Sequence, residues 1–173
     1  MKAHYFSTVL AVCLITIGVM LRILPHPANF APITAIALFG GAVLPKKVAV
    51  WVPLVAMMVS DAFIGFYQLM PLIWACYLLI ALASSQWLRS GNLYTGVTLT
   101  AAASIFFFVI TNFGVWLTSG MYSHTWSGLV SCYTLALPFF RNTFLSDVVY
   151  TAVLFGAYAL ATRTHNRRVA VRA

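Results

Sequence analysis

The chain has 173 residues, of which 62% are hydrophobic and only 7% charged, and its formal net charge at neutral pH is +8. Soluble domains carry about 25% charged residues, so this composition excludes an ordinary soluble domain. The long apolar runs also differ from the alternating strands of an outer-membrane barrel. At about 20 residues per span, the length allows roughly six transmembrane helices.

Six apolar runs are predicted to form membrane-embedded helices. In chain order they cover residues 5–24, 30–44, 48–66, 70–88, 93–117 and 143–162. The second run is short, so we expect it to be tilted, broken or buried among its neighbours. A further apolar stretch, 129–140, is too short to span and is closed by Pro138. We interpret it as a separate short helix, re-entrant or on the surface, that caps the outer side of the bundle. The sequence therefore predicts one all-α membrane domain over residues 1–173.

The basic residues fall at alternate ends of these predicted helices. One set of ends carries Lys2, Lys46, Lys47, Arg89, Arg163, Arg167, Arg168 and Arg172, whereas the turns at 26–29 and 67–68 and the loop 118–128 carry no lysine or arginine. The positive-inside rule then places both termini in the cytoplasm. We interpret the positive charge as a signal of membrane topology and expect no nucleic-acid partner.

Four charged residues remain that topology does not explain: Arg22, Asp61, Arg141 and Asp147. A charge inside a span costs roughly 2.5–3.5 kcal/mol on insertion scales, so each needs a partner or a water-filled cavity. All four are predicted in the outer half, which suggests pairing between helices. Arg141 and Asp147 would not pair with each other on one helix, because they are six residues apart. A purely structural role remains open for Arg22 and Asp147, whereas Asp61 and Arg141 are favoured to face a site.

Polar and aromatic side chains gather on the same predicted outer side. His26 lies in a turn between two prolines, Tyr67 and Tyr77 flank the outer part of the fourth helix, and Asn112 lies near the end of the fifth. A concave pocket lined by such a mixture suits a small-molecule site. Cys76 has the same predicted depth. A lone membrane cysteine is usually an inert apolar residue, but its thiolate is a soft ligand for a transition metal that arrives already chelated. We expect no free metal ion.

Four motifs are long enough to be specific. They read R-x-x-P-H-P-x-N-F-x-P-x-x-A-x-A-L-F-G-G at 22–41, S-D-x-x-I-G-F at 60–66, TNFGVW at 111–116 and PFFRNT at 138–143. Together they resemble a family of small six-helix bacterial membrane proteins related to the substrate-binding S-components of energy-coupling-factor vitamin transporters. The resemblance covers most of the chain and implies an S-component-like bundle of six transmembrane helices in the bacterial inner membrane.

Within that group the chain is similar to the BtuM-type cobalamin transporters, in which a cysteine of the fourth helix coordinates the cobalt of cobalamin. Cys76 stands at the corresponding place. The resemblance implies that Cys76 is the axial cobalt ligand and that His26, Asp61, Tyr77 and Arg141 are pocket residues. It implies cobalamin as a bound substrate that is taken up, with reductive decyanation at Cys76 as a secondary catalytic hypothesis.

The expected partners are cobalamin and the lipid bilayer. The first predicted helix lacks the small-xxx-small pattern with which S-components dock on a shared energy-coupling module, so we expect no obligatory module. Two alternatives stay open. One is an S-component-like carrier for another vitamin, in which Cys76 only packs, and the other is a membrane scaffold whose polar groups tie helices together.

Overall fold

Six α-helices make up nearly all of the described chain. The computed structural model describes residues 2–88 and 93–172, and side chains within 5–88 and 95–163. Within these residues no strand is present. The helices are α1 Lys2–Ile23, α2 Ile33–Val43, α3 Lys46–Ile64, α4 Met70–Trp87, α5 Leu93–Thr118 and α6 Trp126–Arg172. The predicted all-helical fold is confirmed, and the first five of the six predicted runs agree with α1 to α5 to within three residues at each end.

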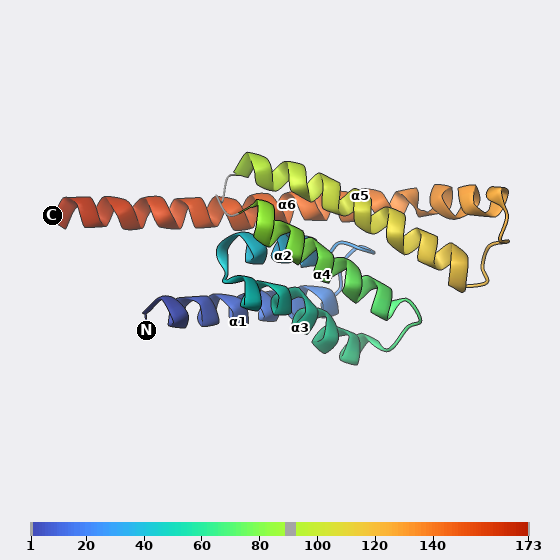
Figure 1. Cartoon of the computed structure of the whole chain (residues 1–173), viewed down its shortest axis with the longest axis horizontal. Coiled ribbons are helices and arrows are strands. Elements are labelled where there is room, and N and C mark those ends of the chain that lie inside the picture. The colour runs from blue at the N-terminus through green and yellow to red at the C-terminus, as the bar shows by residue number, and fades with distance from the viewer. Residues whose placement is uncertain (1, 89–92, 173) are drawn as a thin grey trace.

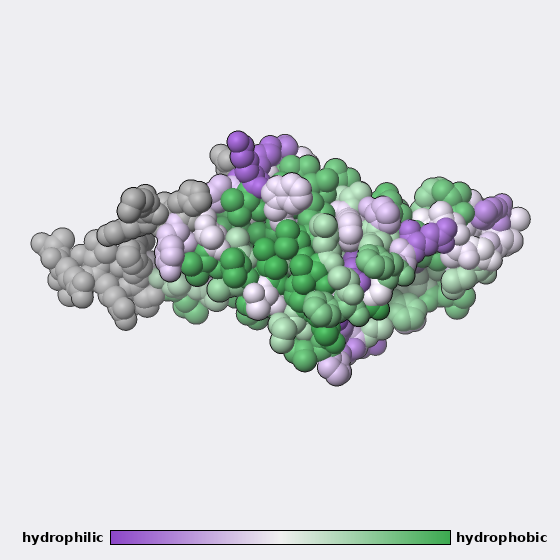
Figure 2. Space-filling model, turned by 90° about the horizontal axis from the view of Figure 1, so that it is seen from below, coloured by the Kyte–Doolittle hydropathy of each residue, from purple (hydrophilic) through white to green (hydrophobic). Residues whose placement is uncertain are grey.

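Five helices, all except α2, are long and apolar enough to cross a membrane. Their outward faces carry large apolar side chains that stay exposed, among them Trp51, Phe63, Ile105 and Val153. Apolar residues cover most of the middle of the face in Figure 2. Soluble monomers rarely expose such continuous apolar surface. These features fit a multi-pass membrane protein.

The structure corrects the prediction of a separate short helix at 129–140. These residues belong to α6, which runs without a break through Pro138. Proline cannot donate to the carbonyl four residues earlier, but neighbouring helices compensate for such gaps inside membranes. Here α5 supports both sides of Pro138: the Tyr133 hydroxyl donates to the Val109 carbonyl oxygen at 2.7 Å, and the ring of Phe108 contacts that of Phe140.

Helix α2 is short and lies inside the bundle. Its 11 residues rise about 16 Å, roughly half of a hydrocarbon core about 30 Å thick. Residues 33–41 are all buried, and α2 packs against α3, α4, α5 and α6. Of the three alternatives expected for this run, which were a tilted, a broken or a buried helix, the structure shows burial among its neighbours. The helix begins three residues later than predicted, after a loop in which Asn29 has φ 61° and Pro32 precedes the first turn.

Helices α2 and α4 approach closely at Gly41. A Cβ atom at this position would lie 2.6 Å from the Ser84 Cβ and 2.9 Å from the Ala81 carbonyl oxygen. The Ser84 hydroxyl donates to the Leu38 carbonyl oxygen of α2 across the same contact. Glycine is therefore required here because the neighbouring backbone occupies the space of a side chain.

Both termini lie at one end of the bundle, together with the turn between α2 and α3 (Figure 1). The opposite end, called the loop end below, holds the connections 24–32, 65–69 and 119–125. Lys46, Lys47 and Arg163 are exposed. The side chains of the other basic residues used for the topology prediction lie outside the described residues: Lys2, Arg89, Arg167, Arg168 and Arg172.

Candidate functional site

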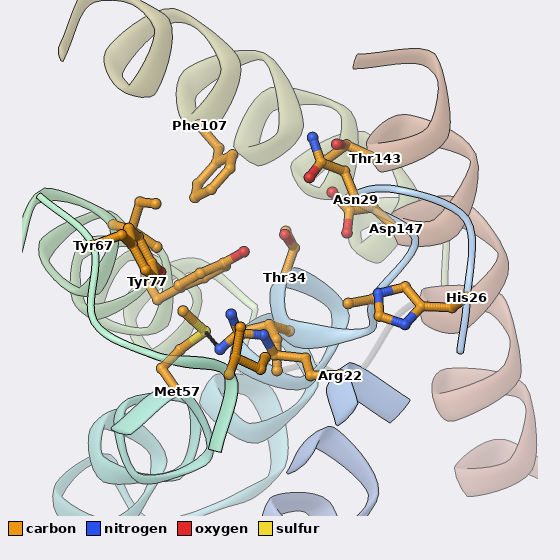
Figure 3. A pocket seen from close by; sticks show the side chains of 14 residues that line it. Arg22, His26, Asn29, Thr34, Met57, Tyr67, Tyr77, Phe107, Thr143 and Asp147 are labelled. Atoms are coloured by element: carbon orange, nitrogen blue, oxygen red, sulfur yellow. Dashed lines mark hydrogen bonds between the residues drawn. The ribbon is translucent and has the colours of Figure 1, made fainter. Parts of the chain in front are cut away.

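A cavity of about 370 Å³ opens at the loop end, next to the first turn of α2. This volume is in the range of small-molecule pockets. Because α2 begins only halfway through the bundle, the space beyond its first turn is bounded by the loop 24–32 instead of by a helix. The side chains around it come from all six helices, from this loop and from Tyr67 in the connection 65–69, and Figure 3 labels ten of them around the common space.

One side of the cavity is formed by an ion pair between α1 and α3. The Arg22 Nη2 atom lies 2.9 Å from Asp61 Oδ1, and Arg22 Nη1 donates to the Ser60 hydroxyl at 2.6 Å. The Trp74 indole N–H donates to Asp61 Oδ2 at 2.8 Å. Asp61 is fully buried and Arg22 is 15% exposed. Asp61 Oδ2 thus accepts a hydrogen bond, and Oδ1 has no hydrogen-bond partner but lies in ion-pair contact with Arg22. The predicted pairing of charges between helices is confirmed for these two residues.

Asp147 of α6 is in a different state. It lines the cavity and is only 1% exposed. Its Oδ2 atom accepts a hydrogen bond from the Ser104 hydroxyl of α5 at 2.7 Å, but its Oδ1 atom has no hydrogen-bond partner among the described residues. Thr34 of α2 lies between Asp147 and Tyr77 in Figure 3. The cavity wall thus contains a buried carboxylate oxygen without a hydrogen-bond partner among the described residues, with the Thr34 side chain close to the same carboxylate.

Aromatic rings form the opposite wall. The rings of Tyr77 and Phe107 stack with centroids 5.1 Å apart and an interplanar angle of 30°. Tyr67, in the connection before α4, adds a phenol near the mouth. Burial raises the pKa of Tyr67, and the nearby Asp61 carboxylate raises it further while Arg22 opposes this. The Tyr67 hydroxyl is therefore protonated at neutral pH and serves as a hydrogen-bonding group.

The loop 24–32 is held over the cavity by α6. The Asn142 side-chain amide donates to the Ala28 carbonyl oxygen at 3.0 Å, and the Ser146 hydroxyl donates to the Ala31 carbonyl oxygen at 3.2 Å. His26 is exposed at the mouth, with its Nδ1 atom 2.6 Å from the Leu24 carbonyl oxygen. These contacts position the loop without closing the opening.

The structure brings together four of the residues predicted to form the site. His26, Tyr67 and Tyr77 line the cavity, and Asp61 lies directly behind Arg22. Asn112 lines a neighbouring cavity of about 230 Å³, whose wall shares Phe107 and other residues with the first. Two spaces at the loop end are therefore adjacent, and the larger one is lined by three of the seven predicted site residues.

Arg141 and Cys76 line neither cavity. Arg141 is exposed on α6. Cys76 is 1% exposed and lies beside Tyr77 in the sequence, but consecutive helical residues point about 100° apart, and Tyr77 is the one that faces the cavity. Among the described residues no three or more His, Cys, Asp and Glu side chains come together.

Three polar residues on the cavity wall were not predicted from the sequence: Asn29, Thr34 and Thr143. Asn29 lies in the first of the four specific motifs and Thr143 ends the last one, so the motifs, unlike the composition, pointed to both residues. Thr34 carried none, because a threonine within an apolar run is common. For Asp147, which now lines the cavity, the sequence had left a purely structural role open.

The chain was compared with known families, curated proteins and solved structures. Residues 2–170 match the family described as Family of unknown function (DUF6580). The chain belongs to this family. No curated protein and no solved structure matches it. Because the DUF6580 match spans all six helices, every residue of the cavity lies within it.

Proposed function

We propose that this protein is an S-component-like carrier in the bacterial inner membrane, which binds a small solute in the loop-end cavity and passes it inward. The observation that carries the proposal is the unpartnered oxygen of Asp147 on the cavity wall. Burying a polar group without a partner is costly, and ionisable residues within membrane segments mark substrate pathways. A solute that binds this oxygen removes the cost.

The positions of the basic residues support the proposed orientation. Lys46 and Lys47 begin α3 at the end of the bundle that holds both termini, and the three connections of the loop end contain no lysine or arginine. The positive-inside rule favours cytoplasmic termini. The cavity then opens to the outer side of the membrane, where it can capture a solute for uptake.

A membrane scaffold accounts less well for this arrangement. The Arg22–Asp61 pair has the satisfied geometry of a structural contact between helices, and a scaffold explains that pair. It does not explain an open cavity of about 370 Å³ with a buried, unpartnered carboxylate oxygen beside stacked aromatic rings. Solute binding explains both features.

Cobalamin is the second candidate solute, favoured by the sequence resemblance and by the position of Cys76 next to a cavity residue. Two observations favour a smaller solute instead. A corrinoid with its side chains is far larger than the cavity, so it would have to lie across the mouth. The Cys76 thiol would also have to turn from its buried position toward the cavity before it could bind cobalt or assist decyanation.

Co-purification tests the proposal directly. The wild-type protein and a Thr143→Phe variant, whose larger side chain fills the cavity, are purified in detergent and their small-molecule extracts are compared by mass spectrometry. We expect a compound near equimolar amounts in the wild type and at least about tenfold less in the variant. Identical extracts from the two well-folded proteins would contradict solute binding in this cavity.

The visible spectrum separates the two solutes. Protein from cells grown with cobalamin is compared with the Cys76→Ala variant. A bound corrinoid with shifted absorption bands, lost in the variant, supports cobalamin with cobalt ligation by Cys76. Decyanation is tested by adding a reductant to both proteins with bound cyanocobalamin. If cyanide is lost at the same rate from the wild type and from Cys76→Ala, the decyanation hypothesis is wrong. If the protein is colourless and does not bind added cobalamin, the smaller solute is the remaining candidate.

A further inference from the structure

The charges around the cavity do not balance. Two ionisable side chains line its buried part, Arg22 and Asp147. The charge of Arg22 is neutralised by Asp61 at 2.9 Å, whereas Asp147 has no cationic partner among the described residues. When Asp147 is ionised, its negative charge has no counter-ion in this buried part of the cavity.

Two positive features near the cavity are too weak to balance Asp147. The first turn of α2 directs the positive end of its dipole toward this space, but that end is equivalent to only about half a charge. His26 is exposed at the mouth, where water and salt screen it. The buried site therefore keeps a net negative charge when Asp147 is ionised.

The groups near Asp147 suit a protonated amino group. An ammonium group has three hydrogen-bond donors and no acceptor. Asp147 offers a free carboxylate oxygen, and the hydroxyls of Thr34 and Tyr77 lie on the same side of the cavity in Figure 3. The stacked rings of Tyr77 and Phe107 provide an apolar wall for the body of such a ligand and a favourable surface for its charge.

We infer that the carried solute is a small organic cation whose protonated amino group binds Asp147 Oδ1, with its apolar part against Tyr77 and Phe107. The inference rests on the proposed function and specifies its substrate class. The ammonium group supplies the missing positive charge, and the Arg22–Asp61 pair forms a neutral side of the same cavity.

Three probes of matched shape test the charge preference: benzylammonium, benzyl alcohol and benzoate. Thermal unfolding of the full-length protein in detergent is followed as each probe is titrated at constant ionic strength. We expect benzylammonium to raise the unfolding midpoint in a saturable way, and the other two to have little effect. In Asp147→Asn, which keeps the shape of the side chain, we expect benzylammonium to bind about tenfold more weakly or worse.

Two further variants act as controls. Asp147→Glu keeps the charge, so we expect it to retain the preference for benzylammonium. Thr151→Val removes a buried hydroxyl one turn away on α6 that bonds to Thr100 and does not line the cavity, so its response should match that of the wild type. Each variant is first checked for a cooperative unfolding transition, which separates a lost binding site from a lost fold.

The possible results separate this inference from the proposed function. Equal responses to the three probes, including no response to any of them, or an unchanged response in Asp147→Asn, overturn the organic-cation inference. A neutral or anionic compound that co-purifies with wild type but not with Thr143→Phe also overturns it, and leaves the carrier proposal standing. If Thr143→Phe changes neither the amount of any co-purified compound nor the response of the unfolding midpoint to any probe, the carrier proposal itself fails.

Discussion

At the scale of single residues, the two aspartates of the chain have opposite environments. Asp61 has a cation and an indole donor, whereas Asp147 has one hydroxyl donor and a free oxygen. Removing one member of a buried ion pair leaves the other charge unpaired and costs about 3–5 kcal/mol, and partial exposure of Arg22 places the cost toward the lower end. We therefore expect Asp61→Asn to lower the unfolding midpoint clearly, as measured by thermal unfolding in detergent.

The double variant Arg22→Met/Asp61→Asn checks the cause of this effect. It removes both charges together, so we expect it to recover much of the stability lost in Asp61→Asn. Arg141→Gln is the matched surface control. Because Arg141 is exposed, we expect this substitution to change the free energy of unfolding by no more than about 0.5 kcal/mol. If the double variant lost as much stability as Asp61→Asn and Arg22→Met lose together when measured singly, that result would contradict stabilisation by pairing.

In contrast to Asp61→Asn, Asp147→Asn is not expected to lower the thermal stability of the protein in the absence of ligand. The substitution removes a buried charge whose Oδ1 atom has no partner, and an amide oxygen can still accept the Ser104 hydrogen bond. We expect an unchanged or higher unfolding midpoint in the same thermal assay, as is common for residues kept for binding. A loss as large as that of Asp61→Asn would show that Asp147 is a structural contact.

This contrast also shows what the sequence could predict about the site. Charged residues in apolar runs need partners, so pairing between helices followed from cost alone, but the cost did not indicate that Arg22 of the first run pairs with Asp61 of the third. The state of Asp147 depends on what lies opposite it on α5 and α2, which hydropathy does not encode. Likewise, the choice between Cys76 and Tyr77 as the cavity residue depends on the rotation of α4 about its axis.

At the scale of helices, the contact between α2 and α4 is a sensitive point. Gly41→Ala places a methyl group 2.6 Å from the Ser84 Cβ, so the helices must separate, and we expect a loss of about 1–3 kcal/mol in unfolding free energy. Gly40→Ala is the matched control on the same helix. Its added methyl group would meet no atom closer than 3.8 Å, so it should be tolerated. Equal midpoints for the two variants would contradict the tight packing.

The helices themselves were largely predictable because about 20 apolar residues in a row have few other stable conformations. The sequence analysis wrongly divided the residues of α6 into two helices, 129–140 and 143–162, because Pro138 normally ends a helix in water. Its continuity depends on the support of α5 through Tyr133 and Phe140, which are tertiary contacts. Sequence patterns thus identified the elements, and packing decided where one element continued into the next.

At the scale of the whole molecule, the short helix α2 links fold to function. A bundle in which every helix crossed the membrane completely would leave no room at the loop end. Because α2 covers only about half of that distance, the loop 24–32 and the cavity occupy the rest. The chain still passes from one end of the bundle to the other six times, which places both termini at the same end (Figure 1).

The direction of uptake requires the loop end to face outward, and site-specific labelling checks this. Single cysteines are introduced as Gln68→Cys in the connection 65–69 and Lys47→Cys at the start of α3, where both native side chains are exposed. The background carries Cys13→Ala, since Cys76 and Cys132 are buried. We expect a membrane-impermeant maleimide to label Gln68→Cys in intact spheroplasts, and Lys47→Cys only after permeabilisation. The reverse pattern would place the cavity on the cytoplasmic side and turn the proposed importer into a protein that collects its solute from within the cell.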